Sequence, residues 1–435
     1  MATLPEIPKG KELEECISAI LQSGGYFIEK NIIEREEGTE VLELDVVATE
    51  YMTAEPVSSF VEVKSGDWGF KDLFKIRGWL DYLEYERGLF ITDRPKDNPE
   101  YFREKAQKIG IELIQVPDWK HASSTLAETM TIVELSADDV IAWRFSYWIE
   151  RRLLETLKKW KKRYHGDFKC YQVLDEYYFL INSRILFTDN IVERLYSLYE
   201  AYKQHPRLTA RCGNEILGSS FEDDVDVLSA DLFKKTYYSC EFNVIQISTF
   251  IEHRARLALL KCTVDYLIKR RKKEERTKRS FGLSYEEMLL HDLPASFKKG
   301  LDSLEAQPSF HRYPVFWQWY LWLFGGFILK DYQEGEYELL SVKSGVPVDD
   351  IPQALNAFQI LFPTDGGWEI DLSPESDIRL LKMASVPFCG VGAFYRLLLH
   401  EAEEYKELVL PGRHTRDDLI KWNNLSAKLL EDDVA

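Results

Sequence analysis

The sequence predicts a small α/β domain with a mixed sheet, followed by a large, mostly α-helical C-terminal region. Residues 1–118 alternate between short stretches of helical and strand periodicity. From about residue 130 onward, the apolar residues recur almost wholly at helical spacing. Hydrophobic residues make up 45% of the 435 residues, which is enough to bury a large core. We therefore expect a domain at 1–120, a linker at 121–135 and a helical region of one or two subdomains at 136–435.

The elements of the N-terminal domain follow from its periodicity. Leu13, Ile17 and Ile20 recur at helical spacing, and Gly24 and Gly25 end that helix. Strand patterns follow, and then helix and strand patterns alternate. The expected elements are a helix at 11–21, strands at 26–33, 41–48 and 59–64, a helix at 70–83, a strand at 88–92, a helix at 99–109 and a strand at 111–116. This order is typical of a small α/β domain with a mixed sheet.

The helical region begins at 136–139, where a serine precedes two aspartates in the pattern of a helix N-terminus. The following apolar stripe continues to residue 157, and further runs are expected near 190–204, 247–273, 315–330, 354–361, 376–384, 392–405 and 416–430. The segment 313–329 has 17 uncharged residues, at the lower limit for a membrane span. Because it contains Pro314, Gln318 and a Gly325-Gly326 pair, we expect a buried core helix and no membrane partner.

Charge and cysteine usage exclude several classes of protein. The net charge of −18 excludes a globally basic nucleic-acid coat protein, although an enzyme with local basic patches is compatible with it. The six cysteines are scattered without a C-x-x-C pair, which argues against a zinc ribbon or a disulfide scaffold. The first residues lack the pattern of a signal peptide. These features together predict a cytoplasmic protein.

Two predicted strands place acidic side chains on a common face. Strand alternation places Asp45 on the face opposite Leu42, Leu44 and Val46. It likewise separates Glu62 and Lys64 from Val61 and Val63. If the two strands pair, Asp45 and Glu62 converge, and two carboxylates at that distance need a cation between them. Oxygen ligands in small number suit Mg²⁺ or Mn²⁺. Lys64 could then orient the attacking water or offset charge at a phosphate.

A third carboxylate borders the buried face of the first helix. Glu14 precedes Ile17 by three residues and Leu21 by seven, so its burial requires a partner. Glu12 and Glu15 compete with Glu14 for this accessory role, and the spacing of Glu14 from Gly10 and from the apolar stripe favours it.

This ordered set of residues resembles the signature of PD-(D/E)xK nucleases, and among them the Mrr-like restriction endonucleases and archaeal Holliday-junction resolvases. The resemblance covers about 110 residues and is carried by the segments 10–14, 44–47, 61–65, 87–92 and 102–113. It implies the restriction-endonuclease core and Mg²⁺-dependent hydrolysis of phosphodiester bonds. It also implies that Asp45, Glu62 and Lys64 are the metal-binding and catalytic residues, with Glu14 as an accessory carboxylate.

The chain departs from that family at two positions. Leu44 stands where a proline often precedes the first acid. Many relatives carry a glutamine or lysine on the helix after the motif lysine, and here either Lys71 or Lys75 could fill that place.

The helical region contains two basic runs that could bind nucleic acid. Residues 1–120 contain 15 lysines and arginines against 25 aspartates and glutamates, a balance of −10, whereas nucleic acid requires cationic contacts. The expected contact residues are Lys158, Lys159, Lys161, Lys162 and Arg163 in one run, and Lys269, Arg270, Arg271, Lys272 and Lys273 in the other. The alternative interpretation is that the runs are solvated helix ends, and it applies more to the first run than to the second.

The prediction from the sequence is therefore a metal-dependent endonuclease acting on DNA, with a role in restriction or anti-phage defence by analogy with that fold. An RNA nuclease or a branched-DNA resolvase is the alternative within enzymes. A binding or assembly protein that retains the nuclease fold without turnover is the alternative outside them. The helical region is expected to mediate homo-oligomerisation or to bind a partner protein.

Overall fold

The structure is a computed structural model that describes residues 8–36, 39–118, 121–133, 135–163, 169–217, 244–274, 284–326, 328, 333–361 and 395. The chain divides into two compact units, with the division between Tyr147 and Trp148. We call the part up to Tyr147 the N-terminal unit and the part from Trp148 the helical unit. The expected helices at 376–384 and 416–430 lie outside the described residues, as does all but Tyr395 of that at 392–405.

The N-terminal unit contains a five-stranded mixed sheet in the order β1-β2-β3-β4-β5. The strands are β1 (Tyr26–Glu36), β2 (Thr39–Glu50), β3 (Val57–Lys64), β4 (Arg87–Thr92) and β5 (Ile111–Gln115). β1, β2 and β3 pair antiparallel, whereas β4 runs parallel to both β3 and β5. The predicted mixed sheet is confirmed.

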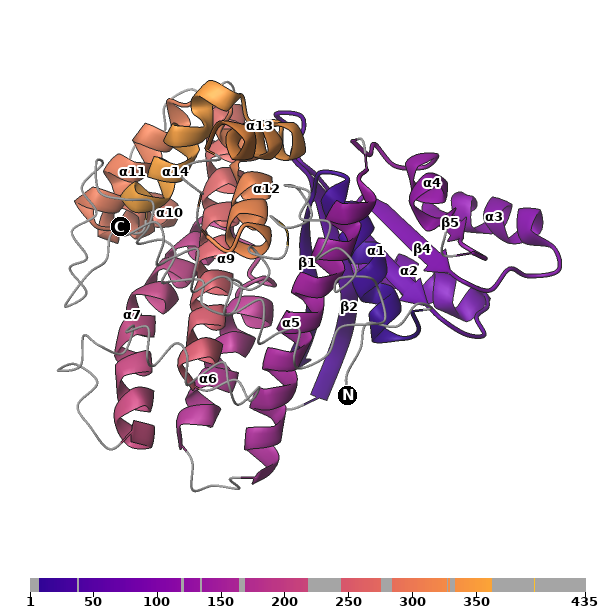
Figure 1. The fold of residues 1–435 in the computed structure, drawn as a ribbon, viewed down its shortest axis with the longest axis horizontal. Helices are drawn as coiled ribbons and strands as arrows, with labels where there is room; N and C mark the ends of the chain where they lie inside the picture. Colours follow the sequence, from indigo (N-terminus) through magenta and orange to yellow (C-terminus); the bar gives the residue numbers. More distant parts are fainter. Residues whose placement is uncertain are drawn as a thin grey trace, which may run out of the picture. The chain divides into compact units, whose positions relative to one another are not determined.

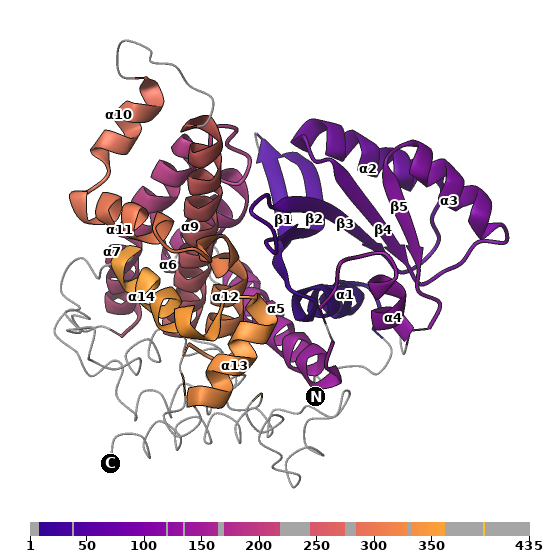
Figure 2. The same ribbon diagram turned by 90° about the horizontal axis from the view of Figure 1, so that it is seen from above.

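Helices cover both faces of this sheet. The helices are α1 (Lys11–Ser23), α2 (Phe70–Leu83), α3 (Pro99–Lys108) and α4 (Ala122–Ala127). α1 and α4 lie on one face, and α2 and α3 lie on the other (Figures 1 and 2). α2 packs so closely on β4 that a Cβ atom at Gly88 would lie 2.6 Å from Leu80 Cδ1. A side chain at this position would force Leu80, which is fully buried, to repack.

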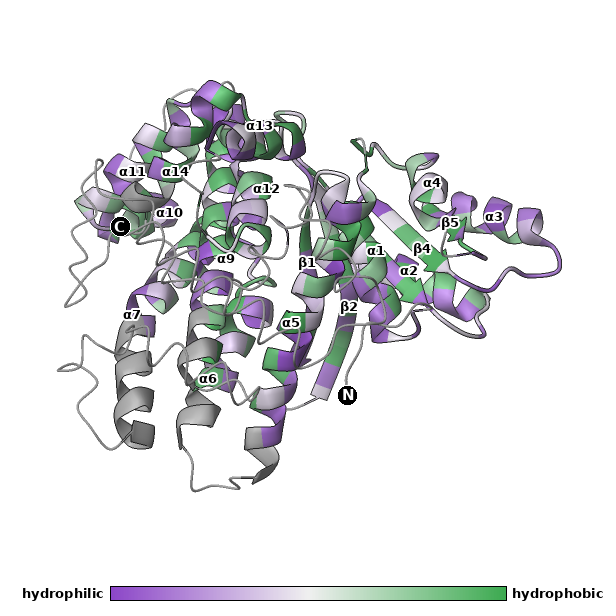
Figure 3. Cartoon of the chain, in the orientation of Figure 1, coloured by the Kyte–Doolittle hydropathy of each residue, from purple (hydrophilic) through white to green (hydrophobic). Residues whose placement is uncertain are grey.

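Burial in the N-terminal unit follows the strand and helix periodicities. β4 is mostly hydrophobic because both of its faces are covered, whereas α3 is mostly hydrophilic (Figure 3). In β3 the alternation is less regular, since the polar Glu62 is as buried as its aliphatic neighbours. A buried carboxylate of this kind requires compensation.

The segment expected to be a linker, 121–135, is structured over most of its length. It contains α4, in which Ala122 and Leu126 are buried, and the amide of Val133 donates to the carbonyl of Gly24. The alanine and leucine are too few for a recognisable period in the sequence, so this short helix is decided by its contact with β5.

The helical unit is built around α9 (Val244–Glu274), which packs against α6 (Lys169–Phe179), α7 (Ile191–Leu217) and α11 (Ala295–Glu305). α6, α7 and α9 run side by side (Figure 1). The remaining described helices are α5 (Ala137–Arg163), which enters from the N-terminal unit, α10 (Tyr285–Asp292), α12 (Tyr313–Gln318), α13 (Gln333–Ser344) and α14 (Ile351–Leu361). The mostly helical character is confirmed, although α6, α10, α11 and α13 were not among the expected runs.

The aromatic segment expected as one helix at 315–330 is shorter than predicted. α12 passes into a π-helical turn at Trp319–Leu323 and helical structure ends there, because Gly325 and Gly326 both adopt positive φ. Every residue from Tyr313 to Gly326 is buried, as expected of a core segment. No helix among the described residues is both long enough and apolar enough to cross a membrane.

Candidate active site

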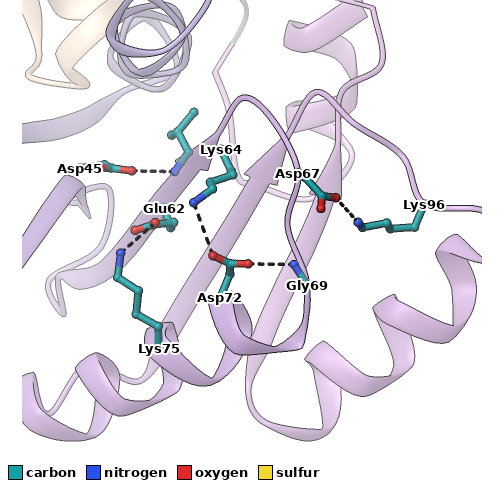
Figure 4. A network of polar contacts seen from close by, with 9 residues as sticks. Asp45, Glu62, Lys64, Asp67, Gly69, Asp72, Lys75 and Lys96 are labelled. Carbon is teal, nitrogen blue, oxygen red and sulfur yellow. Dashed lines mark hydrogen bonds and ion pairs between the residues drawn. The ribbon is translucent and has the colours of Figure 1, made fainter.

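Asp45 and Glu62 lie where β2 and β3 separate. The pairing of the two strands reaches Val46 opposite Val61, so Asp45 and Glu62 occupy the next opposed positions, on the same face of the sheet. The carboxylate of Asp45 accepts the main-chain N–H of Val63 at 3.0 Å, in place of a ladder bond (Figure 4). The side chain thereby satisfies an amide at the point where the ladder ends.

Glu62 forms an ion pair with a lysine of α2. Lys75 Nζ lies 3.3 Å from Glu62 Oε1 (Figure 4). The same ammonium lies 4.0 Å from the centre of the Trp79 ring. Lys71, the other lysine considered for this role, is exposed. The structure therefore places Lys75 at the two-carboxylate site, on the face of the sheet covered by α2.

Lys64 lies on the same face of β3 and contacts a carboxylate that the sequence reasoning missed. Its Nζ lies 3.5 Å from Asp72 Oδ1, while Asp72 Oδ2 accepts the amide of Gly69 at 2.8 Å (Figure 4). Asp72 is the N3 residue of α2, so the signal available in the sequence was an acidic residue in the first turn of the expected helix, placed to accept the amide of its N-cap residue, Gly69. Because Asp72 is anchored by the backbone, it restricts where the Lys64 ammonium can lie.

Glu14 reaches the neighbourhood of Asp45 from α1. The beginning of α1 is tied to the end of β3 by a hydrogen bond of 2.9 Å from the amide of Gly10 to Ser65 Oγ. Burial, followed by the nearby charge of Asp45, raises the pKa of Glu14 to about 7. Glu15 is buried beside Cys16, whose pKa is raised mainly by burial and further by the charge of Glu15. The geometry thus favours Glu14 as the accessory carboxylate.

The carboxyl groups of Glu62 and Asp45 both have raised pKa values at this site. Burial and then the charge of Asp45 raise the pKa of Glu62 to about 7, even with Lys75 opposing the shift. Burial also raises the pKa of Asp45, against the hydrogen bond from Val63. Groups with such values cluster at functional sites, because a site that binds a cation or moves a proton needs them.

The donor set fits one hard divalent cation with few protein ligands. Asp45 and Glu62 present carboxylate oxygens on one face, and a cation there would relieve the cost of ionising them. Within the described ranges, no group of three histidine, cysteine, aspartate or glutamate side chains is placed to hold a metal ion. Two carboxylates with water and substrate oxygens completing the shell match the preference of Mg²⁺.

The two basic runs differ in what their side chains contact. Arg270 and Arg271 both form ion pairs with Glu305, which joins the end of α9 to the end of α11. Lys158, Lys159, Lys269 and Lys272 are exposed. The side chains of Lys161, Lys162, Arg163 and Lys273 lie outside the described part. The two arginines therefore have a structural role that the sequence did not reveal.

No family model matches this chain, and no curated protein and no solved structure matches it. The resemblance to PD-(D/E)xK nucleases therefore remains a prediction from the sequence.

Proposed function

We propose that the N-terminal unit is a divalent-metal-dependent nuclease that hydrolyses phosphodiester bonds of DNA. The observation that carries the proposal is the opposed pair Asp45 and Glu62 with Lys64 on the same face, two positions along β3. An acidic pair with both pKa values raised by burial and a lysine beside it is suited to holding a cation against a phosphate.

Each side chain has a distinct part in the proposed reaction. Asp45 and Glu62 would hold Mg²⁺, which when bound polarises the phosphate and makes coordinated water more acidic. Lys64 would orient the attacking water or offset the charge on the phosphate, from a position restricted by Asp72. Lys75 holds the Glu62 carboxylate through their ion pair. The water gives up a proton to the solvent as its oxygen bonds to phosphorus, the P–O bond to the leaving group breaks, and the leaving oxygen takes a proton from the solvent.

A cleavage assay tests the proposal. The purified chain is incubated with double-stranded, single-stranded and branched DNA, and with RNA, in Mg²⁺, in Mn²⁺ and in chelator. Cleavage in metal but not in chelator, lost in Glu62→Gln and retained in Lys108→Ala, is the expected result. Lys108 is an exposed lysine of the same unit outside the proposed site. Metal-independent cleavage, or none on any substrate, would contradict the proposal, and cleavage of RNA alone would establish the alternative enzyme.

A further inference from the structure

The acidic charge of the N-terminal unit is unevenly distributed along its sequence. Residues 1–63 contain four lysines and arginines against 14 aspartates and glutamates. Residues 64–108, which include α2 and α3, contain ten lysines and arginines against nine acidic residues. The segment that forms the face of α2 and α3 is therefore the part of this unit best suited to approach a polyanion.

Both helices of that face carry exposed aromatic rings. Phe74 of α2 is 62% exposed and Tyr101 of α3 is 45% exposed. Phe70, one helical turn before Phe74, lies between the two helices, with its ring 5.9 Å from Tyr101 and stacked at 4.8 Å on Phe102. The Tyr101 ring thus packs against Phe70 and Phe102, which limits the conformational freedom that Tyr101 loses when it binds something.

Lysines accompany the rings and connect them with the candidate active site. Lys71 is exposed, three residues before Phe74 and four before Lys75 on α2, so the three share one side of the helix. Lys75 reaches Glu62. Lys105 lies 5.3 Å from the centre of the Tyr101 ring. Exposed rings interleaved with lysines are the combination that binds bases by stacking and phosphates by charge.

We infer that the α2–α3 face, with Phe74 and Tyr101 as stacking platforms and Lys71 and Lys105 as phosphate contacts, binds an unpaired stretch of nucleic acid and leads it to the site at Glu62. A duplex hides the faces of its bases, so the exposed rings favour single-stranded segments. The inference rests on the proposed nuclease function and narrows it to substrates that contain a single-stranded region.

Binding is measured without turnover, by fluorescence anisotropy of the full chain with a labelled oligothymidylate in chelator. Phe74→Ala and Tyr101→Ala should each raise Kd roughly fivefold to a hundredfold, the usual effect of removing one stacking ring. Tyr101→Phe retains the ring and should stay within about twofold of the wild-type Kd. Tyr285→Ala is the matched control, because this tyrosine is 57% exposed but is followed by two glutamates on α10. Its Kd should not change.

The same assay reads the phosphate contacts and the strand preference. Lys71→Ala and Lys105→Ala should each flatten the slope of log Kd against log salt by about 0.7, the value for one phosphate of a single strand. A blunt duplex of the same length should bind more weakly. Phe74→Ala and Tyr101→Ala should not change the Kd for that duplex, because its base faces are not accessible to the rings. An oligouridylate in place of the oligothymidylate distinguishes an RNA source from a DNA source of the unpaired segment.

Unchanged affinity in the Phe74→Ala, Tyr101→Ala double variant, or tighter binding of the duplex, would overturn the inference. These results are separate from those for the nuclease. Ring-dependent binding without cleavage would keep the surface and refute the proposed activity. Cleavage with ring-independent affinity would do the reverse.

Discussion

The affinity of the site for Mg²⁺ should depend steeply on pH, because the carboxyl group that binds the ion must first lose its proton. With the pKa of Glu62 at about 7, about nine-tenths of its carboxyl groups are protonated at pH 6 and about one-tenth at pH 8. Ion binding at pH 6 should therefore release about 0.9 proton from this group alone. The apparent Kd should fall about tenfold between pH 6 and pH 8, equivalent to about 1.4 kcal/mol.

Isothermal titration calorimetry measures both quantities. Titrations of Mg²⁺ at pH 6 in two buffers with different ionisation enthalpies give the number of protons released per ion. Repeating them at pH 8 gives the change in Kd. Glu62→Gln should lose most of the affinity at pH 8, whereas Glu86→Gln, a change at an exposed acid of the same unit, should titrate as the wild type does.

A particular outcome would refute this reasoning. If the chain binds Mg²⁺ with equal affinity at pH 6 and pH 8 and releases no proton at either, Glu62 and Asp45 are not the ligands. Equal binding in wild type and Glu62→Gln would lead to the same conclusion by an independent route.

The other predictions concern turnover, stability and the basic runs. Lys64→Ala should reduce cleavage to background while leaving the circular dichroism spectrum unchanged, since Lys64 contributes nothing to the aliphatic core. Without metal, the free energy of unfolding should fall as pH rises from 4.5 to 7, because the folded chain holds a proton on Glu14, with its pKa of about 7, that the unfolded chain has released. Glu14→Gln should therefore stabilise the chain by about 3 kcal/mol at pH 8 and by almost nothing at pH 4, as measured by urea unfolding. Arg270→Ala should lower the melting temperature through the lost ion pair with Glu305. Lys269→Ala and Lys272→Ala should instead flatten the salt dependence of nucleic-acid binding if that run contacts phosphates.

The sequence was sufficient to place most elements of the N-terminal unit. α2 begins and ends where its periodicity predicted, at Phe70 and Leu83, and each of the five strands lies within a few residues of its expected range. These elements are determined locally, because the period of the apolar residues reports which face will be buried. For the same reason, the placement of Asp45 and Glu62 on a common face followed from alternation once their two strands were assumed to pair.

Tertiary structure decided the features that depend on contacts between residues far apart in the chain. The choice of Lys75 over Lys71 follows from the ion pair that the packing of α2 on the sheet allows. The proximity of Glu14 to Asp45 likewise depends on the packing of α1, whose start is tied to Ser65 by the amide of Gly10. Contacts between distant residues also decide that α4 forms within the expected linker and that Arg270 pairs with Glu305. A sequence period specifies which side of an element is apolar, whereas the partner of a polar side chain depends on which elements pack together and in what register.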